Sequence, residues 1–428
     1  MSAFPPGPSE PPVLQTLRWL TRPISFLESC RRRFGETFSV QFLGFRTPMV
    51  MISDPEAIQA LYTVRDHALP PGRALALEPI VGPRSVLLLE GREHLARRRL
   101  MLPQFHGERM RAYESIVAGA VARDVETWPA GQPFAIHPHM QSVTLDVILR
   151  AVFGVTDPGR RERLAAKLGG LLAGSASPRL QFGVLLARRF RRAPDPLEGL
   201  QALTAEIDAL LAAEVAERRA DPREDILSML IGARFEDGEP MDDAEIRDQL
   251  MTLLLAGHET TATALAWTFD LLVRHPRALE RLVAEVDAGE EDAYVRAVVA
   301  ESLRLRPVVP IAGRRLNTEL EVDGHVLPPG TDVTPAIWLA HTRPDRYPEP
   351  YAFRPERFLE NAPATYAWIP FGGGVRRCLG AAFAEMEMRV ALGEIVRRRP
   401  LRPASPRAET VARRNVTFSP ARGTMVIA

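Results

Sequence analysis

Cysteine is scarce in this sequence, with only Cys30 and Cys378 among 428 residues. Two cysteines so far apart exclude a disulfide framework and favour a reducing compartment, so we expect a cytoplasmic protein. The sequence also has almost no net charge, because 54 basic residues are balanced by 53 acidic ones. This balance gives no reason to expect nucleic acid, or an anionic membrane engaged through bulk charge, as a partner.

A signal peptide and a membrane anchor are not expected either. Residues 1–12 are rich in proline and lack a basic start followed by an apolar core. The longest apolar stretch, Leu250 to Val273, has about the right length to cross a bilayer. However, it carries His258 and Glu259 in its middle and Asp270 near its end, and charges there are costly in lipid. We therefore expect a long buried helix.

The spacing of apolar residues predicts a mostly helical chain. Helix-like spacing covers residues 92–101, 107–127, 140–152, 159–172 and 197–219. Asp242 and Glu245 form a capping-box-like start for a further helix, which runs to about Arg274 before Pro276 stops it. The length predicts one very large domain or two intimate subdomains.

Strand signals are confined to short segments. Alternating residues predict a hairpin over 37–42 and 48–52, after which Asp54-Pro55 caps a helix. Asp323-Gly324 predicts a second hairpin between 320–322 and 326–327. Residues 344–380 are dense in proline, glycine and aromatics and predict a long ordered loop, which is usually functional. A last helix is expected from near Cys378 to about Arg398.

The first motif with chemical content runs from Phe371 through Gly372, Gly373 and Gly374 to Cys378 and Gly380. Its glycines allow close approach of the backbone to a flat ligand. A cysteine at a helix start is favoured as a thiolate, and Arg376 can pair with an acidic group on the same ligand. These residues predict a thiolate metal ligand, with an inert buried thiol as the alternative.

The second motif, Ala256-Gly257-His258-Glu259-Thr260-Thr261, lies inside the long apolar stretch. A buried acid beside a hydroxyl needs partners and suggests a proton path, whereas an ordinary polar face of the helix is the alternative. The zinc-protease helix motif is excluded, because its second histidine would fall at Ala262.

Two further pairs carry little weight by themselves. Glu301 and Arg304 share one helical face, and a later Arg357 could join them in a buried cluster that pins the loop. His94 and Arg98 lie one helical turn apart, and taken alone they are most simply surface or packing residues.

Together and in this order, the four motifs resemble the cytochrome P-450 family over nearly the whole chain. The family's cysteine pattern corresponds to Phe371, Gly374, Arg376, Cys378 and Gly380 and matches fully. The resemblance implies the mainly α cytochrome P-450 fold, a large helical domain with a smaller β-rich subdomain. It implies one domain over 1–428, a β-rich portion at about 35–55 and 314–335, and a haem-ligand loop and helix at 371–398.

The resemblance also implies haem b (iron protoporphyrin IX) as cofactor and Cys378 as its metal ligand. The haem contacts that it implies are His94, Arg98, Ala256, Arg314, Phe371, Gly372 and Arg376. Arg315 could replace Arg314 at a propionate. Glu259 and Thr260 match the family's catalytic acid–alcohol pair, which would deliver protons to dioxygen. Glu301, Arg304 and Arg357 match its structural triad.

The implied activity is that of a monooxygenase that hydroxylates a small apolar substrate, such as a fatty acid, terpenoid or steroid. Electrons would come from a separate ferredoxin or flavodoxin with its reductase, and we expect a monomer. A peroxide-using haem-thiolate enzyme and a non-catalytic haem binder are the alternatives, and the intact Glu259–Thr260 pair argues against both.

The substrate is predicted only by composition. Residues 69–89 and 172–194 are the expected access regions, and their wealth of Leu, Ala, Val and Phe favours an apolar substrate. Arg73, Arg84 and Arg179 could hold a carboxylate, although solvated surface is the simpler interpretation of each.

Overall fold

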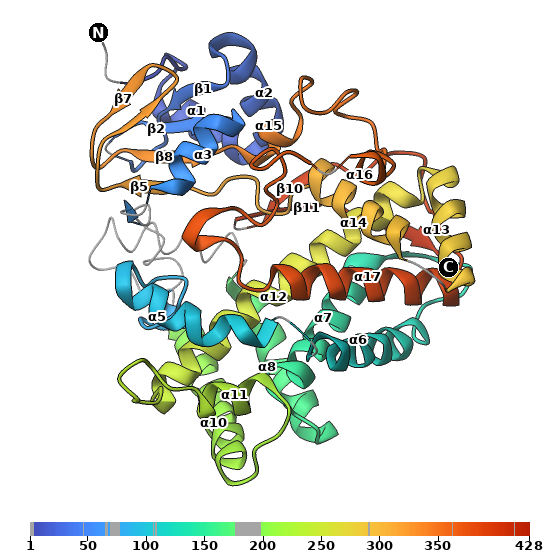
Figure 1. Cartoon of the computed structure of the whole chain (residues 1–428). Coiled ribbons are helices and arrows are strands. Elements are labelled where there is room, and N and C mark those ends of the chain that lie inside the picture. Colours follow the sequence, from blue (N-terminus) through green and yellow to red (C-terminus); the bar gives the residue numbers. More distant parts are fainter. Residues whose placement is uncertain are drawn as a thin grey trace. The chain divides into compact units, whose positions relative to one another are not determined.

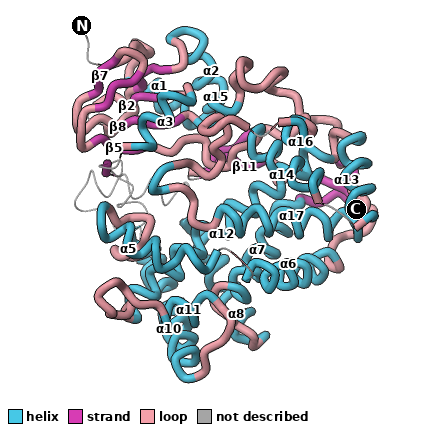
Figure 2. The backbone as a smooth tube through the Cα atoms, in the orientation of Figure 1, coloured by secondary structure: helices cyan, strands magenta, loops and turns pink. Residues whose placement is uncertain are grey.

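The computed structural model describes residues 4–45, 47–64, 67–68, 78–105, 107, 109–175, 198–289, 292–361, 363–414 and 416–428. Helices dominate, and the strands gather into small sheets (Figures 1 and 2). The expected fold class, mainly α with a smaller β-rich part, is confirmed.

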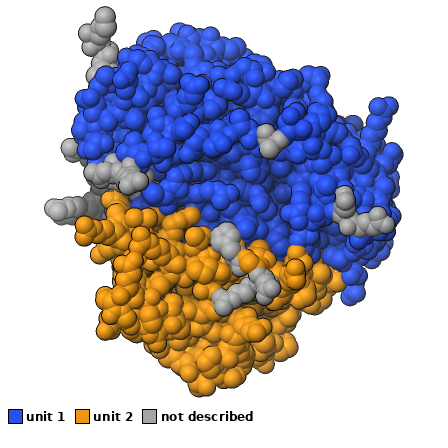
Figure 3. Space-filling view, viewed as in Figure 1, with its two compact units in different colours: residues 1–71, 125–140, 260–428 blue, residues 72–124, 141–259 orange. Residues whose placement is uncertain are grey.

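The chain packs as two compact units, which Figure 3 colours separately. Unit 1 comprises residues 1–71, 125–140 and 260–428, and unit 2 comprises residues 72–124 and 141–259. Each is described by itself below. The description of residues 1–428 as one domain stays a prediction.

The main sheet of unit 1 has five strands in the order β1-β2-β8-β5-β3. Their bounds are β1 Thr37–Val40, β2 Met49–Ile52, β3 His67–Ala68, β5 Arg314–Leu316 and β8 Asp332–Pro335. β1 and β2 form the expected antiparallel hairpin, and β2 then pairs in parallel with β8. The sheet thereby joins two segments that are almost 300 residues apart in sequence, and Val50, Ile52 and Val333 lie in the core beneath it.

The second expected hairpin is also confirmed. Strands β6 (Leu320–Val322) and β7 (His325–Leu327) pair across Asp323 and Gly324, whose φ values are 47° and 73°. Two consecutive positive φ angles suit a tight two-residue turn, which Asp-Gly adopts readily.

Two small sheets near the C-terminus were not expected from the sequence. β4 (Pro133–Ala135), β12 (Met425–Ile427) and β9 (Arg402–Pro403) form one, and β10 (Val411–Arg414) with β11 (Thr417–Pro420) forms the other. Each strand has at most four residues, too few for a reliable alternation, so its pairing depends on contacts distant in sequence.

Unit 1 also contains helices. They are α1 Pro12–Thr21, α2 Pro23–Phe34, α3 Pro55–Thr63, α13 Pro276–Ala288, α14 Ala293–Leu305, α15 Ile337–His341, α16 Arg357–Glu360, η2 Gly374–Arg376 and α17 Ala381–Arg398. Asp54 caps α3 as expected, because its carboxylate accepts the N–H groups of Glu56 and Ala57. Pro276, which was expected to stop the preceding helix, is also the first residue of α13.

Unit 2 is helical. It contains α5 Gly91–Met101, η1 Leu102–Phe105, α8 Pro158–Ser175, α10 Glu198–Ala220, α11 Ile226–Gly232 and nearly all of α6 Arg109–Val125. Two helices, α7 Ile136–Ala151 and α12 Asp243–Leu272, have residues in both units. The expected helices are all present, and α7 begins four residues before the predicted position.

The long helix α12 starts as predicted, since Asp242 accepts the N–H of Glu245 at 2.8 Å. Every residue from Thr261 to Leu272 is buried, which confirms the expected buried helix. Within the part of the chain that is described, no helix combines the length and the apolar character needed to span a membrane.

Candidate functional site

Cys378 lies in unit 1, in the connection between η2 and α17, and its side chain is exposed. Its backbone N–H donates to the carbonyl oxygen of Phe371 at 2.9 Å, which closes the glycine-rich segment into a compact loop. The two ends of the motif are thus held together by the backbone itself.

The last helix begins three residues later than the expected start near Cys378, so that expectation is wrong. Gly380 is the N-cap of α17, and its carbonyl accepts the first helical bond from Ala384 at 2.8 Å. Cys378 lies before this helix, and its N–H is bonded to Phe371.

The glycines of the loop fit against Tyr62 of α3. Gly372 and Gly374 have φ values of 66° and 63°, a region that side chains disfavour. A Cβ atom on Gly373 would lie 2.4 Å from the Tyr62 ring, and one on Gly374 would lie 2.5 Å from the Tyr62 carbonyl oxygen. The close approach that the structure shows at these glycines is to Tyr62, and an approach to a flat ligand stays a prediction.

Arg314 and Arg315 differ in a way that bears on which of them could bind a ligand. Arg315 is bound to Asp332 through two N–H groups, at 2.8 and 2.9 Å. Arg314 is buried, and it donates to the carbonyl oxygens of Gly313 at 2.9 Å and Gly373 at 3.5 Å. No carboxylate among the described residues pairs with Arg314, and burial lowers its pKa.

Tyr62 completes a group of buried donors beside the cysteine loop. The Arg314 guanidinium lies 5.4 Å from the centre of its ring. Its hydroxyl has no hydrogen-bond partner in the described part of the chain, and burial raises its pKa to about 12. A buried guanidinium and a buried hydroxyl beside a thiol suit a ligand that carries carboxylates and a metal.

Glu301, Arg304 and Arg357 come together in unit 1. Arg304 donates to both carboxylate oxygens of Glu301 at 2.6 and 2.8 Å, and both side chains are fully buried. Arg357 donates to Glu301 Oε1 at 3.1 Å. Arg304 also donates to the carbonyl oxygens of His341, Pro350 and Ala352 at 2.8, 2.7 and 3.2 Å. The cluster therefore binds the segment that leads to Cys378.

His341, which the sequence did not single out, also binds the segment that leads to Cys378. Its Nε2 accepts the N–H of Ile369 at 2.8 Å, so its Nδ1 carries the proton and donates to the carbonyl of Arg304 at 3.1 Å. Burial lowers the pKa of His341 to about 3, so the ring stays neutral in this role.

In unit 2, the polar residues of α12 are held by α7. Gln141 Nε2 donates to Glu259 Oε2 at 2.6 Å, and Thr144 Oγ1 lies 2.9 Å from His258 Nδ1. Burial lowers the pKa of His258 to about 4, so this histidine is neutral near pH 7. Gly257 faces Ile148 of α7, which a Cβ would approach to 3.3 Å.

In unit 1, α12 continues with Thr260, which is partly exposed, and Thr261, which is buried. The Thr261 side chain forms a hydrogen bond with the carboxyl group of Glu387 on α17. Glu387 is buried, and burial raises its pKa to about 8 despite this bond. No sequence signal distinguished Glu387 from the other acids of α17.

His94 and Arg98 lie on α5 in unit 2, where His94 is buried and Arg98 is partly exposed. Their neighbours are engaged elsewhere, since Arg97 pairs with Glu245 at 2.7 Å and Arg99 with Glu236 at 2.6 Å. Arg97 and Arg99 are therefore held by acidic partners of their own.

The expected access regions are described only in part. Residues 176–194, with Arg179, and residues 69–77, with Arg73, lie outside the described residues. Arg84 is described, and it pairs with Asp242 at 2.5 Å on an exposed surface. This pairing supports the simpler interpretation of Arg84 as a surface residue.

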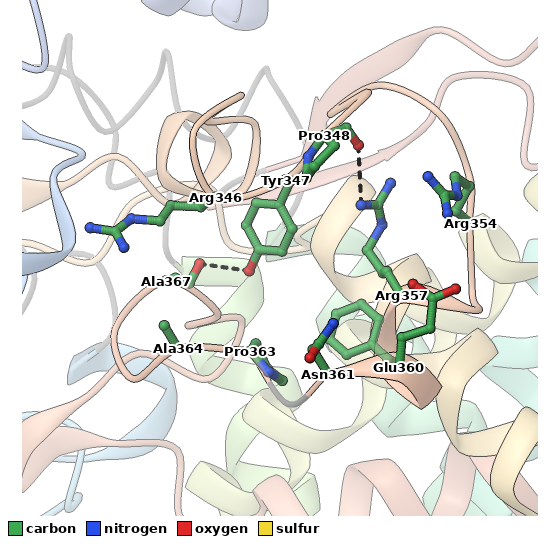
Figure 4. Close-up of a pocket in the computed structure, with 11 residues that line it drawn as sticks. Arg346, Tyr347, Pro348, Arg354, Arg357, Glu360, Asn361, Pro363, Ala364 and Ala367 are labelled. Atoms are coloured by element: carbon green, nitrogen blue, oxygen red, sulfur yellow. Dashed lines mark hydrogen bonds between the residues drawn. The ribbon is translucent and has the colours of Figure 1, made fainter.

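A separate pocket of about 220 Å³ lies on unit 1, at the loop that contains Arg357. Figure 4 shows Arg357 donating to the carbonyl of Pro348 and the Tyr347 hydroxyl donating to that of Ala367, at 3.2 and 3.0 Å. Both bonds join residues of the segment 347–367 to one another, so they stabilise the conformation of that segment and give no evidence of a bound ligand.

Comparison with known proteins gives one consistent result. The cytochrome P450 family matches residues 5–418 of the chain. Cytochrome P450 135B1 of Mycobacterium tuberculosis is 40% identical over 440 residues, which cover 99% of this chain and 91% of the relative. Cytochrome P450 137 of the same organism is 38% identical over 400 residues, covering 92% and 83%.

Solved structures agree with these matches. A cyanobacterial CYP120A1 with bound retinoic acid superimposes with a TM-score of 0.84 at 26% identity, and the match covers 99% of this chain and 98% of that one.

Proposed function

The chain belongs to the cytochrome P450 family, and from this membership we propose that it hydroxylates a small apolar substrate with dioxygen and electrons from a separate ferredoxin or flavodoxin and its reductase. Haem-thiolate monooxygenase chemistry and haem b as cofactor follow from the family itself. The substrate class, the redox partner, the roles of individual residues and a cytoplasmic, monomeric state belong to the proposal.

The donor set of this chain fits a haem. We assign Cys378 as the iron ligand, and Arg314 and Arg376 as donors to the haem propionates. The buried state of Arg314, without a carboxylate of its own, supports this assignment, and the engagement of Arg315 with Asp332 argues against the alternative. His94, Arg98, Ala256, Phe371 and Gly372 are assigned as further haem contacts. Tyr62 joins these contacts, because a carboxylate would satisfy its buried hydroxyl.

When bound, a thiolate-ligated haem supplies the oxygen-activating chemistry. The residues of α12 then supply protons. Thr260 holds a proton on its hydroxyl, and Glu259 takes up a proton from solvent and, as the carboxylic acid, passes it on to restore that hydroxyl. Gln141 keeps Glu259 oriented through its bond to Oε2, so the carboxylate works in a fixed position.

The observation that carries the proposal is the joint presence of the Cys378 loop and the Glu259–Thr260 pair on a long buried helix. A protein that only stores haem has no use for an acid beside a hydroxyl at a partly exposed position in the middle of such a helix. A peroxide-using enzyme receives its protons with the peroxide and has no need of the pair either.

An apolar substrate is supported by two observations. Residues 78–89, the described part of the first access region, include the apolar residues Ile80, Val81 and Val86. The structural relative with 26% identity has bound retinoic acid, which is hydrocarbon apart from one carboxyl group. A screen of fatty acids, terpenoids and steroids for shifts of the haem absorption spectrum would identify the class.

Thr260→Ala tests the proton-delivery role. With substrate, dioxygen, an electron donor and a ferredoxin, the wild type is expected to couple electron consumption to product. The variant is expected to consume electrons at a similar rate while losing most of the product, by about 10- to 100-fold. Unchanged coupling in the variant would contradict the role of Thr260. Product with peroxide but none with dioxygen and electrons would instead establish the peroxide-using alternative.

A further inference from the structure

The outer face of α1 in unit 1 is apolar. Val13, Leu14, Leu17 and Leu20 are 56%, 47%, 53% and 47% exposed, whereas the opposite face buries Gln15 and Trp19. At about 100° per residue, the four aliphatic side chains form one stripe along the helix. Leu43, also exposed, extends the stripe, since its N–H donates to Thr16 Oγ1 at 2.8 Å.

Hydrogen bonds fix α1 in this orientation. The buried Gln15 donates to the carbonyl oxygens of Glu10 at 2.7 Å and Pro8 at 3.2 Å, and its Oε1 accepts the N–H of Gln41 at 2.9 Å. Rolling the helix to bury its leucines would break all three bonds and leave the Gln15 amide without partners, which is costly. The apolar stripe is therefore a stable property of the surface.

Positive charge is concentrated on the two helices α1 and α2, which contact each other. Residues 12–34 contain five arginines and one glutamate, although the whole chain carries a net charge of only +1. Arg18, on α1, is paired with Glu10 at 2.6 Å. Arg22, Arg32 and Arg33 are exposed. The one glutamate, Glu28, is engaged with the Tyr351 hydroxyl at 2.9 Å and the Trp338 ring N–H at 3.3 Å.

We propose that α1 and the arginines of α2 form a docking surface for the face of a lipid bilayer with anionic headgroups. An apolar helical stripe combined with exposed arginines, here on the adjoining residues of α2 and its link to α1, is the composition of segments that lie in a membrane interface. Ten residues of helix span only about 15 Å, so α1 lies on the bilayer and does not cross it. A second copy of the chain is the poorer occupant, because a symmetric contact would bring the two sets of arginines together.

The contact would act independently of catalysis, so its test needs no substrate. Purified holoenzyme is sedimented with vesicles of phosphatidylcholine alone or mixed with phosphatidylglycerol. The wild type is expected to bind the mixed vesicles in a salt-sensitive way. Leu14→Ser/Leu17→Ser is expected to weaken this binding by about tenfold or more, since two side chains lose their insertion. Arg32→Gln/Arg33→Gln is expected to weaken binding to the mixed vesicles by about tenfold and to leave phosphatidylcholine unaffected.

A matched control removes two exposed apolar side chains elsewhere on unit 1. Val326→Ser/Leu359→Ser is expected to bind like the wild type. All variants replace exposed residues, and unchanged circular dichroism would verify their folding. The proposal is overturned if the wild type does not bind vesicles or if the α1 variant binds equally well. It is also overturned if, without lipid, the wild type sediments as a dimer that Leu14→Ser/Leu17→Ser dissociates, because α1 would then be a self-association face.

Discussion

Glu387 should make the stability of the folded protein decrease as the pH rises, and replacing it by glutamine should remove this dependence. The carboxyl group is buried on α17, and its pKa is raised from 4.5 to about 8 because burial disfavours the charged form. Glutamine has nearly the same shape, can accept the same hydrogen bond from Thr261 and never ionises. The change with pH of the difference between Glu387→Gln and the wild type therefore measures the cost of the charge, because any fixed cost of the amide is the same at every pH.

The direction and the magnitude of this pH dependence of stability follow from proton linkage. Below pH 4.5 the folded and unfolded chains both hold the proton, and the stability of the protonated state is fully present. Above it the unfolded chain releases the proton while the folded chain keeps it up to about pH 8, so the wild type loses about 1.4 kcal/mol per pH unit. As the pH rises from about 5 to about 8, the free energy of unfolding of the variant should therefore increase by roughly 4 kcal/mol relative to that of the wild type.

Thermal unfolding of the holoenzyme, followed by circular dichroism, measures this difference. For a chain of this length roughly 4 kcal/mol corresponds to about 4 °C, so the midpoint of Glu387→Gln should rise by that amount relative to wild type between about pH 5 and pH 8. Glu360→Gln, at an exposed position on α16, is the control and should follow the wild type. A difference between Glu387→Gln and wild type that stays constant with pH would refute the burial of an uncharged acid.

Other changes have equally definite outcomes. Cys378→Ser should abolish the red-shifted absorption band of the reduced, carbon monoxide-bound haem, and survival of that band would refute thiolate ligation. Glu301→Ala leaves the fully buried Arg304 without its carboxylate and should cost about 3–5 kcal/mol, seen as a lower thermal midpoint, whereas an unchanged midpoint would show that the carbonyls alone suffice. Gly374→Ala places a Cβ 2.5 Å from the carbonyl of Tyr62 at a positive φ and should lower the haem content of the purified protein, and full haem content would show that the loop can shift.

Local signals in the sequence predicted most of the elements that position the site. Asp323-Gly324 specified its hairpin because the required positive φ angles belong to those two residues alone. Asp54 and Asp242 specified helix starts because a cap needs only the next three residues. The cysteine motif is of the same kind, since its residues lie within ten positions of one another.

The features that were not predicted depend on contacts between residues that are far apart in the sequence. Strand β12 pairs with β4, almost 300 residues earlier in the sequence, and neither segment has a strong pattern of its own. Tyr62, Gln141 and Glu387 each meet their partners through packing within their own unit, and each is an ordinary residue of its helix until packing places it there. The start of α17 was misplaced for a related reason, since its N-cap is Gly380, which has no side chain to mark the position.

The bonds that Arg304 makes have a consequence for how the segment before Cys378 tolerates substitution. One buried guanidinium on α14 donates to the carbonyl oxygens of His341, Pro350 and Ala352. These acceptors are backbone atoms, so the bonds do not depend on the side chains at those positions, whereas a change at Arg304 removes all of them at once. The order of this segment therefore depends on one side chain that lies at least 37 residues before it in the sequence.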